Sequence, residues 1–111
     1  IMIFSRTGNI TVVTQERASI IELVANIEKK YDQIKHDNII VNLFSVKEIE
    51  PSAINDFLLL SNKHTSTNKS FVVVTNKIDI DTVPEELTVV PTLQEAHDII
   101  EMEEIERDLG I

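Results

Sequence analysis

Short runs of apolar residues mark five places along the chain as strands. The first two runs, IMIFS and ITVVT, open the sequence and are separated by the polar stretch Arg6–Asn9. That stretch contains Gly8, one of only two glycines in the chain. Because glycine tolerates the positive φ of a tight turn, the first fifteen residues predict a β-hairpin.

Three further runs predict strands that lie deeper in the sheet. They are Ile39–Val41, extended by Leu43 and Phe44, then Phe71–Val74, and the shorter Thr88–Val90. The first of these has almost no polar interruption, which is typical of a strand that is covered on both faces.

Between the hairpin and the third strand, the apolar spacing changes to that of a helix. Ser19 followed by Glu22 is a capping box, in which the Ser oxygen accepts the N3 amide and the Glu reaches back. Apolar residues then recur every three or four positions, as expected for one helix face packed on a sheet, at Ile20, Leu23, Val24, Ile27, Tyr31 and Ile34. A helix from residue 20 to about Lys35 is predicted.

Two more helices are predicted after the third and fifth strands. Pro51 suits a first helical turn, and the segment after it carries Ile54 and Phe57–Leu60 before it turns polar at residues 62–69. The last helix begins at a second capping box, Thr92 to Glu95, and ends at Gly110. Its apolar side holds Leu93, Ala96, Ile99, Ile100, Ile105 and Leu109. Residues 78–87 include Pro84 and predict a loop with at most one helical turn.

This order of elements predicts an α/β fold in which helices pack on a largely parallel or mixed sheet. A length of 111 residues is typical of a single domain, and we expect residues 1–111 to form one.

The charge of the chain argues against a nucleic-acid partner. The 19 acidic and 10 basic residues give a formal net charge of −9, and the one local basic cluster in the sequence is Lys29–Lys30. Aromatic residues, which would stack on bases, are also sparse.

No apolar run approaches the roughly 18 residues of a membrane span, and no leader pattern opens the chain. The absence of cysteine excludes disulfides and zinc–thiolate sites and fits a reducing cytosol, so we expect a cytoplasmic location.

The motifs that carry enzyme chemistry are missing or incomplete. Asn76-Lys77-Ile78-Asp79 has the spacing of the GTPase base-recognition element, but the glycine-rich phosphate loop that must accompany it is absent. His36, His64 and His97 lie in different elements, without the spacing of a zinc site. No GxSxG nucleophile elbow occurs, although a dispersed Ser–His–Asp triad stays open at this stage. We therefore expect no catalytic residue, no metal and no cofactor.

The segment NIIVNLFSVKEIEPSAIN, residues 38–55, resembles the STAS domain, the family of sulphate-transporter and anti-sigma-factor-antagonist proteins. The runs FVVVTN and VVPTLQEAHDII extend the resemblance over nearly the whole chain. It implies a mixed sheet with an N-terminal hairpin and helices packed on it. The acidic end, MEEIERDLG, resembles STAS-like proteins of Bacteroidetes bacteria in particular.

Two departures from the family pattern stand out. Where the family carries a phosphorylatable serine at the start of a helix, this sequence has Pro51, with Glu50 before it and Ser52 and Ala53 after it. The segment Lys77–Leu87 also looks shorter than the one that holds the family's third helix, so we expect that helix to be shortened or missing. Exposed apolar surface would then open at this place, as at many partner sites.

The resemblance implies a non-catalytic regulatory module that binds protein. In the family, the matching loop and helix start face the partner, so the expected contact residues are Glu50, Ser52, Asn55 and Asp56, with Ile54 and Phe57 packed inside. One alternative is a self-associating accessory or structural protein, for instance a homodimer formed through the shortened crossover. A remote alternative is an enzyme, since some similar sequences carry a ribonuclease Z label, but such nucleases need a His-rich zinc motif that this chain lacks.

The acidic residues of the last helix have two interpretations. They form either a solubilising face or a docking surface for a basic protein.

Overall fold

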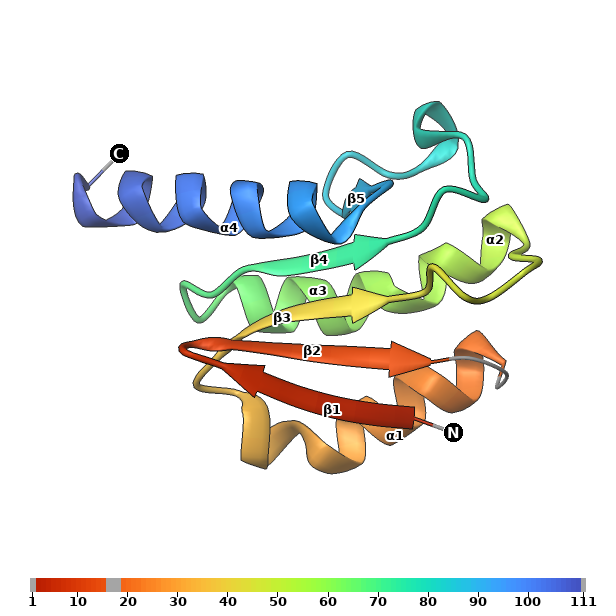
Figure 1. Ribbon diagram of the computed structural model, residues 1–111, viewed down its shortest axis with the longest axis horizontal. Coiled ribbons are helices and arrows are strands. Elements are labelled where there is room, and N and C mark those ends of the chain that lie inside the picture. The colour runs from red at the N-terminus through yellow and green to blue at the C-terminus, as the bar shows by residue number, and fades with distance from the viewer. Residues whose placement is uncertain (1, 16–18, 111) are drawn as a thin grey trace.

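The computed structural model describes residues 2–15 and 19–110. In this part of the chain a single mixed sheet has the strand order β1-β2-β3-β4-β5, built from β1 (Met2–Thr7), β2 (Ile10–Gln15), β3 (Asn38–Asn42), β4 (Phe71–Val74) and β5 (Thr88–Val90). β1 runs antiparallel to β2, whereas the other neighbours are parallel (Figure 1). Parallel neighbours require crossovers. Helices supply those from β2 to β3 and from β3 to β4, whereas the segment from β4 to β5 has a single 3-10 turn.

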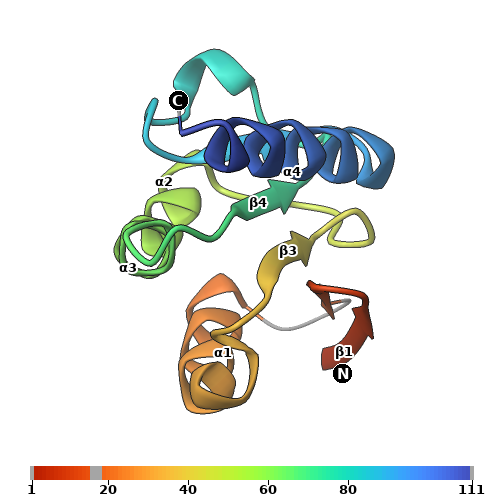
Figure 2. The same ribbon diagram turned by 90° about the vertical axis from the view of Figure 1, so that its left-hand side faces the viewer.

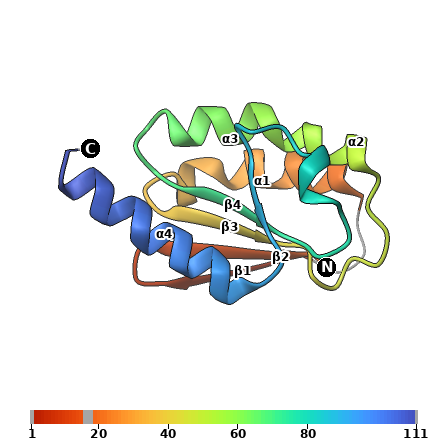
Figure 3. The ribbon, with the colours of Figure 1, turned by 90° about the horizontal axis from the view of Figure 1, so that it is seen from above.

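The helices lie on both faces of the sheet, so the molecule has three layers. Helices α1 (Ile20–Ile34) and α3 (Leu58–Thr65) lie on one face, and α4 (Leu93–Asp108) crosses the other (Figures 2 and 3). The larger core cluster is on the α1 and α3 face and takes in Ile39, Val41 and Val73. Ile40, Val72 and Val74 point the opposite way and pack against Ala96 and Ile100 of α4. The central strands are therefore covered on both faces, as predicted.

The hairpin prediction is confirmed, with a tighter turn than the sequence indicated. Arg6 and Thr7 belong to β1, and Thr7 pairs with Ile10, which leaves two residues in the turn. Gly8 is the first of these, with φ of +61°, as expected for a two-residue turn of type II′.

The prediction for α1 is confirmed at its start and along its apolar face. The Ser19 side chain accepts a hydrogen bond from the Glu22 amide at 3.2 Å. The buried residues of the helix are Ile20, Leu23, Ile27, Tyr31 and Ile34.

The helix predicted after Pro51 is broken into three pieces. A short α2 (Pro51–Ile54) passes through the 3-10 turn η1 (Asn55–Phe57) into α3.

Two apolar residues are not buried, although the apolar runs that contain them suggested that they would be. Leu59 is 79% exposed, because only one side of α3 faces the sheet, and Phe44 is 52% exposed, because it lies in the turn after β3.

The segment between β4 and β5 contains a single short helical element, the 3-10 turn η2 (Ile80–Thr82). This confirms the predicted shortening.

In α4, Thr92 caps the first turn through the Glu95 amide at 3.2 Å, and Gly110 at the end has φ of +72°. The apolar side of α4 is only partly covered, since Ala96 and Ile100 are buried but Ile105 and Leu109 are exposed. Within the described residues, no helix combines the length and apolar character needed to cross a membrane.

Candidate functional site

The loop between β3 and α2 occupies the end of the sheet where the parallel strands finish (Figure 1). Leu43 is fully buried, and its amide donates to the Val74 carbonyl at 2.8 Å, which fixes the start of the loop. The Asn42 side chain then accepts a hydrogen bond from the Phe44 amide at 3.1 Å, a local turn contact typical of asparagine. The loop therefore leaves the sheet in a defined direction and carries Phe44 outward.

The backbone at the start of α2 follows from its sequence. Glu50 takes an extended conformation as the N-cap, and Pro51 occupies the first turn, where its fixed φ suits a helix. The Ala53 amide donates to the Glu50 carbonyl at 2.9 Å. Among the described residues the Glu50 carboxylate makes no capping hydrogen bond, so it remains available at the surface.

The structure gathers the four expected contact residues on the short stretch formed by α2 and η1. All of them are exposed, namely Glu50, Ser52, Asn55 and Asp56. Ile54 and Phe57 point inward and are fully buried in the α1 and α3 core. The division into outward and inward residues is as expected, whereas the role of the outward set in binding stays a prediction.

An apolar hollow of about 320 Å³ lies at the same end of the sheet, next to the start of α4. Phe44 and Leu93, which are 52% and 38% exposed, contribute side chains to its lining. The sequence did not point to it, because Phe44 and Leu93 are far apart along the chain and both belonged to runs expected to be covered.

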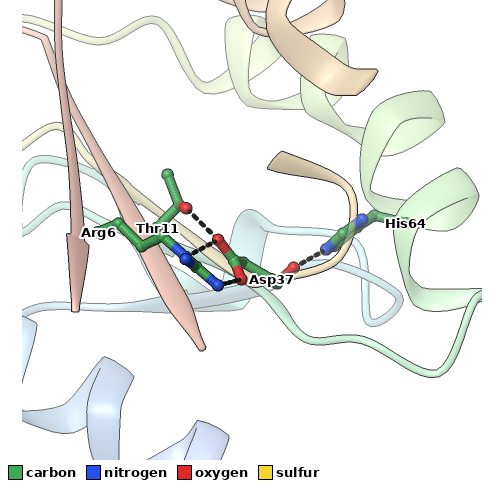
Figure 4. Close-up of polar contacts among 4 residues, drawn as sticks. All are labelled: Arg6, Thr11, Asp37 and His64. Carbon is green, nitrogen blue, oxygen red and sulfur yellow. Dashed lines mark hydrogen bonds and ion pairs between the residues drawn. The ribbon is translucent and has the colours of Figure 1, made fainter. Parts of the chain in front are cut away.

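A second polar group lies at the opposite end of the sheet and joins α1, α3 and the hairpin (Figure 4). The His64 ring is fully buried, with Nε2 at 2.8 Å from the Asp37 carbonyl and Nδ1 at 2.8 Å from the Tyr31 hydroxyl. A carbonyl can only accept, so Nε2 carries the proton. Burial lowers the pKa of His64, which favours the neutral ring, and Nδ1 therefore accepts the Tyr31 hydroxyl proton. Burial also raises the pKa of Tyr31.

Asp37 is buried, with 4% of the residue exposed, and its carboxylate is satisfied from the hairpin. The Arg6 guanidinium contacts both oxygens, at 2.8 Å and 3.1 Å, and the Thr11 hydroxyl donates to Oδ2 at 2.8 Å. Burial alone would raise the pKa of Asp37, but the hydrogen bonds from Arg6 and Thr11 and the Arg6 charge outweigh it and hold this pKa below its usual value.

This geometry is that of a structural network. His64 meets the backbone of Asp37 and not its carboxylate, and the ring has no exposed surface where a substrate could reach it. His36 and His97 belong to other elements, and the described residues contain no group of His, Asp and Glu that could hold a metal ion.

Another network of polar side chains holds the C-terminal half of α4 to the sheet. Glu104 accepts hydrogen bonds from Asn38 at 2.6 Å and from Asn9 at 2.8 Å. The Ser70 hydroxyl donates to Glu103, and Arg107 donates to Ser70 at 3.2 Å. Part of the acidic face of α4 is therefore engaged within the molecule, which neither sequence interpretation anticipated.

Sequence reasoning missed these networks because each joins residues more than twenty positions apart. The signals present in the sequence were weak. Asp37 and Asn38 are polar residues directly before the apolar run Ile39–Val41, and Thr11 is a polar residue inside an apolar run.

No protein-family model matches the chain, and no curated protein matches it in sequence. Solved structures do match. A substituted form of RsbS from Moorella thermoacetica has a TM-score of 0.68 at 11% identity, over 90% of this chain and 94% of that one. A candidate anti-sigma factor antagonist from Thermotoga maritima has a TM-score of 0.61 at 14% identity, over 90% and 94%. A chain of the stressosome, a signal integration and transduction hub, has a TM-score of 0.61 at 11% identity, over 88% and 95%.

At sequence identities of 11% to 14%, the similarity to these solved structures shows the fold alone. The chain has the fold of STAS and anti-sigma-factor-antagonist proteins, with the mixed sheet, the N-terminal hairpin and the packed helices that the resemblance implied.

Proposed function

We propose that this chain, a single STAS-like domain, is a non-catalytic regulatory module that acts by binding another protein, in the manner of an anti-sigma factor antagonist. Two of the similar structures support a regulatory role, since one is a candidate antagonist and the other belongs to a signal integration hub. The partner is a protein, not nucleic acid or membrane, and the location is cytoplasmic. The acidic end of the chain marks a divergent, Bacteroidetes-type member.

The observation that carries the proposal is the composition of the surface where β3 and β4 end. A half-exposed aromatic side chain, Phe44, borders an apolar hollow. The exposed polar residues lie at the same end of the sheet, on the helix start that follows (Figure 1). Protein interfaces commonly combine aromatic anchors with exposed polar side chains, and both kinds are present at this end, although none of the four polar residues lines the hollow itself. We call this surface the α2 surface and define it as Phe44, Glu50, Ser52, Asn55 and Asp56.

Control by phosphorylation is lost in this proposal. Pro51 occupies the aligned acceptor position and has no hydroxyl. Ser52 is exposed, but a residue one position further along a helix points about 100° away. Incubation with a cognate serine kinase tests this directly, and stoichiometric phosphate on Ser52 would refute the lost switch.

Capture from the native host tests the binding surface. Wild-type protein, Phe44→Ala and the control Ile105→Ala serve as baits, because Phe44 and Ile105 are 52% and 53% exposed. We expect one set of proteins to be captured by wild type and by the Ile105→Ala control but lost with Phe44→Ala. Identical capture by all three baits would contradict the proposed surface.

Self-association is the second candidate function, and one observation favours it. The shortened segment around η2 leaves an apolar hollow of about 320 Å³ beside β5, lined in part by Ile80, Pro84 and Ile99. A second copy could cover it. Light scattering distinguishes the two functions, since a homodimer at micromolar concentration would favour self-association over a monomeric adaptor.

A further inference from the structure

A hollow of about 270 Å³ lies at the end of the molecule opposite the α2 surface. It is formed where α1 and α3 end, together with the turns that follow them, and its lining consists of Tyr31, Lys35, His36, Lys63, Thr67 and Lys69. Figure 2 looks onto this end of the molecule and shows α1 and α3 on the same side of the sheet.

The charge of this lining is opposite to that of the chain. Lys35, Lys63 and Lys69 converge on the hollow, and no carboxylate lines it, although acidic residues outnumber basic ones by 19 to 10 in the sequence. Lys35 lies far along the chain from Lys63 and Lys69, so the sequence indicated only Lys29–Lys30 as a basic cluster. The fold creates a second and larger one.

The lysines differ in how far their charges are balanced. Lys35 Nζ lies 3.7 Å from Asp32 Oδ1, which is a solvent-exposed contact. Lys63 Nζ lies 4.6 Å from the centre of the Tyr31 ring, so a cation–π contact holds it over the hollow. Among the described residues, Lys63 and Lys69 have no carboxylate within ion-pair distance. Burial is the main cause that lowers the pKa of His64, and the positive charge of Lys69 lowers it further.

Helix ends account for only part of this positive charge. The carboxyl ends of α1 and α3 each bring roughly half a negative charge, and lysines in a last turn commonly offset it. Two such ends offset about one of the three lysine charges. The positive charge that is left over faces a concave surface.

We propose that this hollow binds a compact oxyanion of the phosphate class, either free or as the terminal group of a small metabolite. Each lysine offers a strongly hydrated point charge with three donors, which suits a compact, multiply charged ion. The hollow is smaller than the roughly 300–1,000 Å³ of pockets for drug-sized ligands. The Tyr31 hydroxyl is already engaged by His64, so the lysines and a ring N–H of His36 supply the donors. This site is independent of the proposed partner binding.

Amide chemical shifts of the intact protein test the proposal. Sodium phosphate is titrated against sodium chloride at equal ionic strength, and we expect phosphate-specific, saturable shifts at residues 35–36 and 63–69. The double variant Lys63→Gln, Lys69→Gln removes two lining charges. Its matched control, Lys29→Gln, Lys30→Gln, removes two exposed charges of α1 that lie outside the lining.

Each exposed ion pair contributes a factor of roughly two to five, so the lining variant should bind phosphate roughly 4- to 25-fold more weakly. The control should stay within about twofold of wild type, by the same argument, because it removes no lining charge. Equal shifts with chloride, or equal weakening in the two double variants, would overturn the proposal. If the lining variant unfolds, each single Lys→Gln substitution at these positions replaces it and should lose the per-lysine factor.

Glycerol phosphate forms a second arm that distinguishes the source of the ion. Tighter binding than inorganic phosphate would assign the site to a phosphate ester, whereas equal or weaker binding would assign it to free phosphate. Failure of both ligands to bind overturns the proposal and leaves the partner-binding function untouched.

Discussion

At the residue scale, the polar groups of the interior form a chain of contacts that reaches from the hairpin to α3. Arg6 and Thr11 satisfy the Asp37 carboxylate, the Asp37 carbonyl accepts from His64, and Tyr31 donates to the same ring. A buried polar group without a partner costs more than its hydrogen bond contributes. The stability of the fold therefore depends on this network being complete.

The Thr11→Val variant tests that dependence with little change in side-chain volume. It removes one donor to a buried carboxylate, and we expect the free energy of unfolding to fall by about 1–3 kcal/mol in urea denaturation. Thr14→Val on the same strand is the matched control, because Thr14 faces the other side of the sheet, and it should change stability by less than about 0.5 kcal/mol. Equal losses would show that Asp37 does not depend on Thr11.

The His64 ring predicts a pH dependence whose sign follows from its burial. Its pKa is lowered in the folded state, so between that value and about 6.5 the unfolded chain binds more protons. Its contribution to stability is complete above this window and is lost as the pH falls through it. Asp37 adds little here, because its pKa lies below the 3.8 of a free carboxyl.

We therefore expect the free energy of unfolding to fall between pH 7.5 and 5.5, by at most about 1.4 kcal/mol per pH unit from this group. His36→Gln, on the exposed surface, should keep the decline, whereas His64→Gln should be less stable at both pH values and lose most of the dependence. A pH-independent wild type would rule out a neutral, buried His64.

At the element scale, α4 is held differently from α1. Ala96 and Ile100 are its buried apolar residues. Its C-terminal half is anchored instead by hydrogen bonds from Asn38 to Glu104 and from Ser70 to Glu103. The sequence predicted the position, cap and end of this helix, because those depend on neighbouring residues. It did not predict the anchoring, because that depends on which strand starts lie beneath the helix. The sequence did not predict that the helix after Pro51 is broken, although it placed Ile54 and Phe57 in the core correctly.

The Asn38→Ala variant tests the anchoring of α4. Asn38 is buried, accepts from the Ser70 amide at 2.8 Å and donates to Glu104, so its loss leaves a buried donor unpaired. We expect unfolding free energy to fall by about 2–3 kcal/mol and amide hydrogen exchange to accelerate in residues 101–108 more than in α1. Asn62→Ala, on the exposed side of α3, should change neither. Uniform acceleration across all helices would contradict a local anchor.

At the scale of the whole molecule, the two ends of the sheet differ in character. The α2 surface, acidic and aromatic, lies where the parallel strands finish, whereas the basic hollow and the His64 network lie where they begin. Composition indicated the negative average charge and the order of elements predicted the fold class, but the basic hollow arises only when distant segments are brought together. The net charge of −9 therefore does not reveal the basic hollow, which lies at the same end of the sheet as the acidic C-terminal half of α4.

The most direct test of the central claim is calorimetric binding of the captured partner to charge-reversed variants. Glu50→Lys with Asp56→Lys alters the α2 surface, and Glu101→Lys with Glu106→Lys makes the same charge change on exposed positions of α4. We expect the first pair to weaken binding at least about tenfold, a loss of about 1.4 kcal/mol, and the second by less than about threefold. Equal loss in both pairs, or loss only in the α4 pair, would contradict binding through the α2 surface.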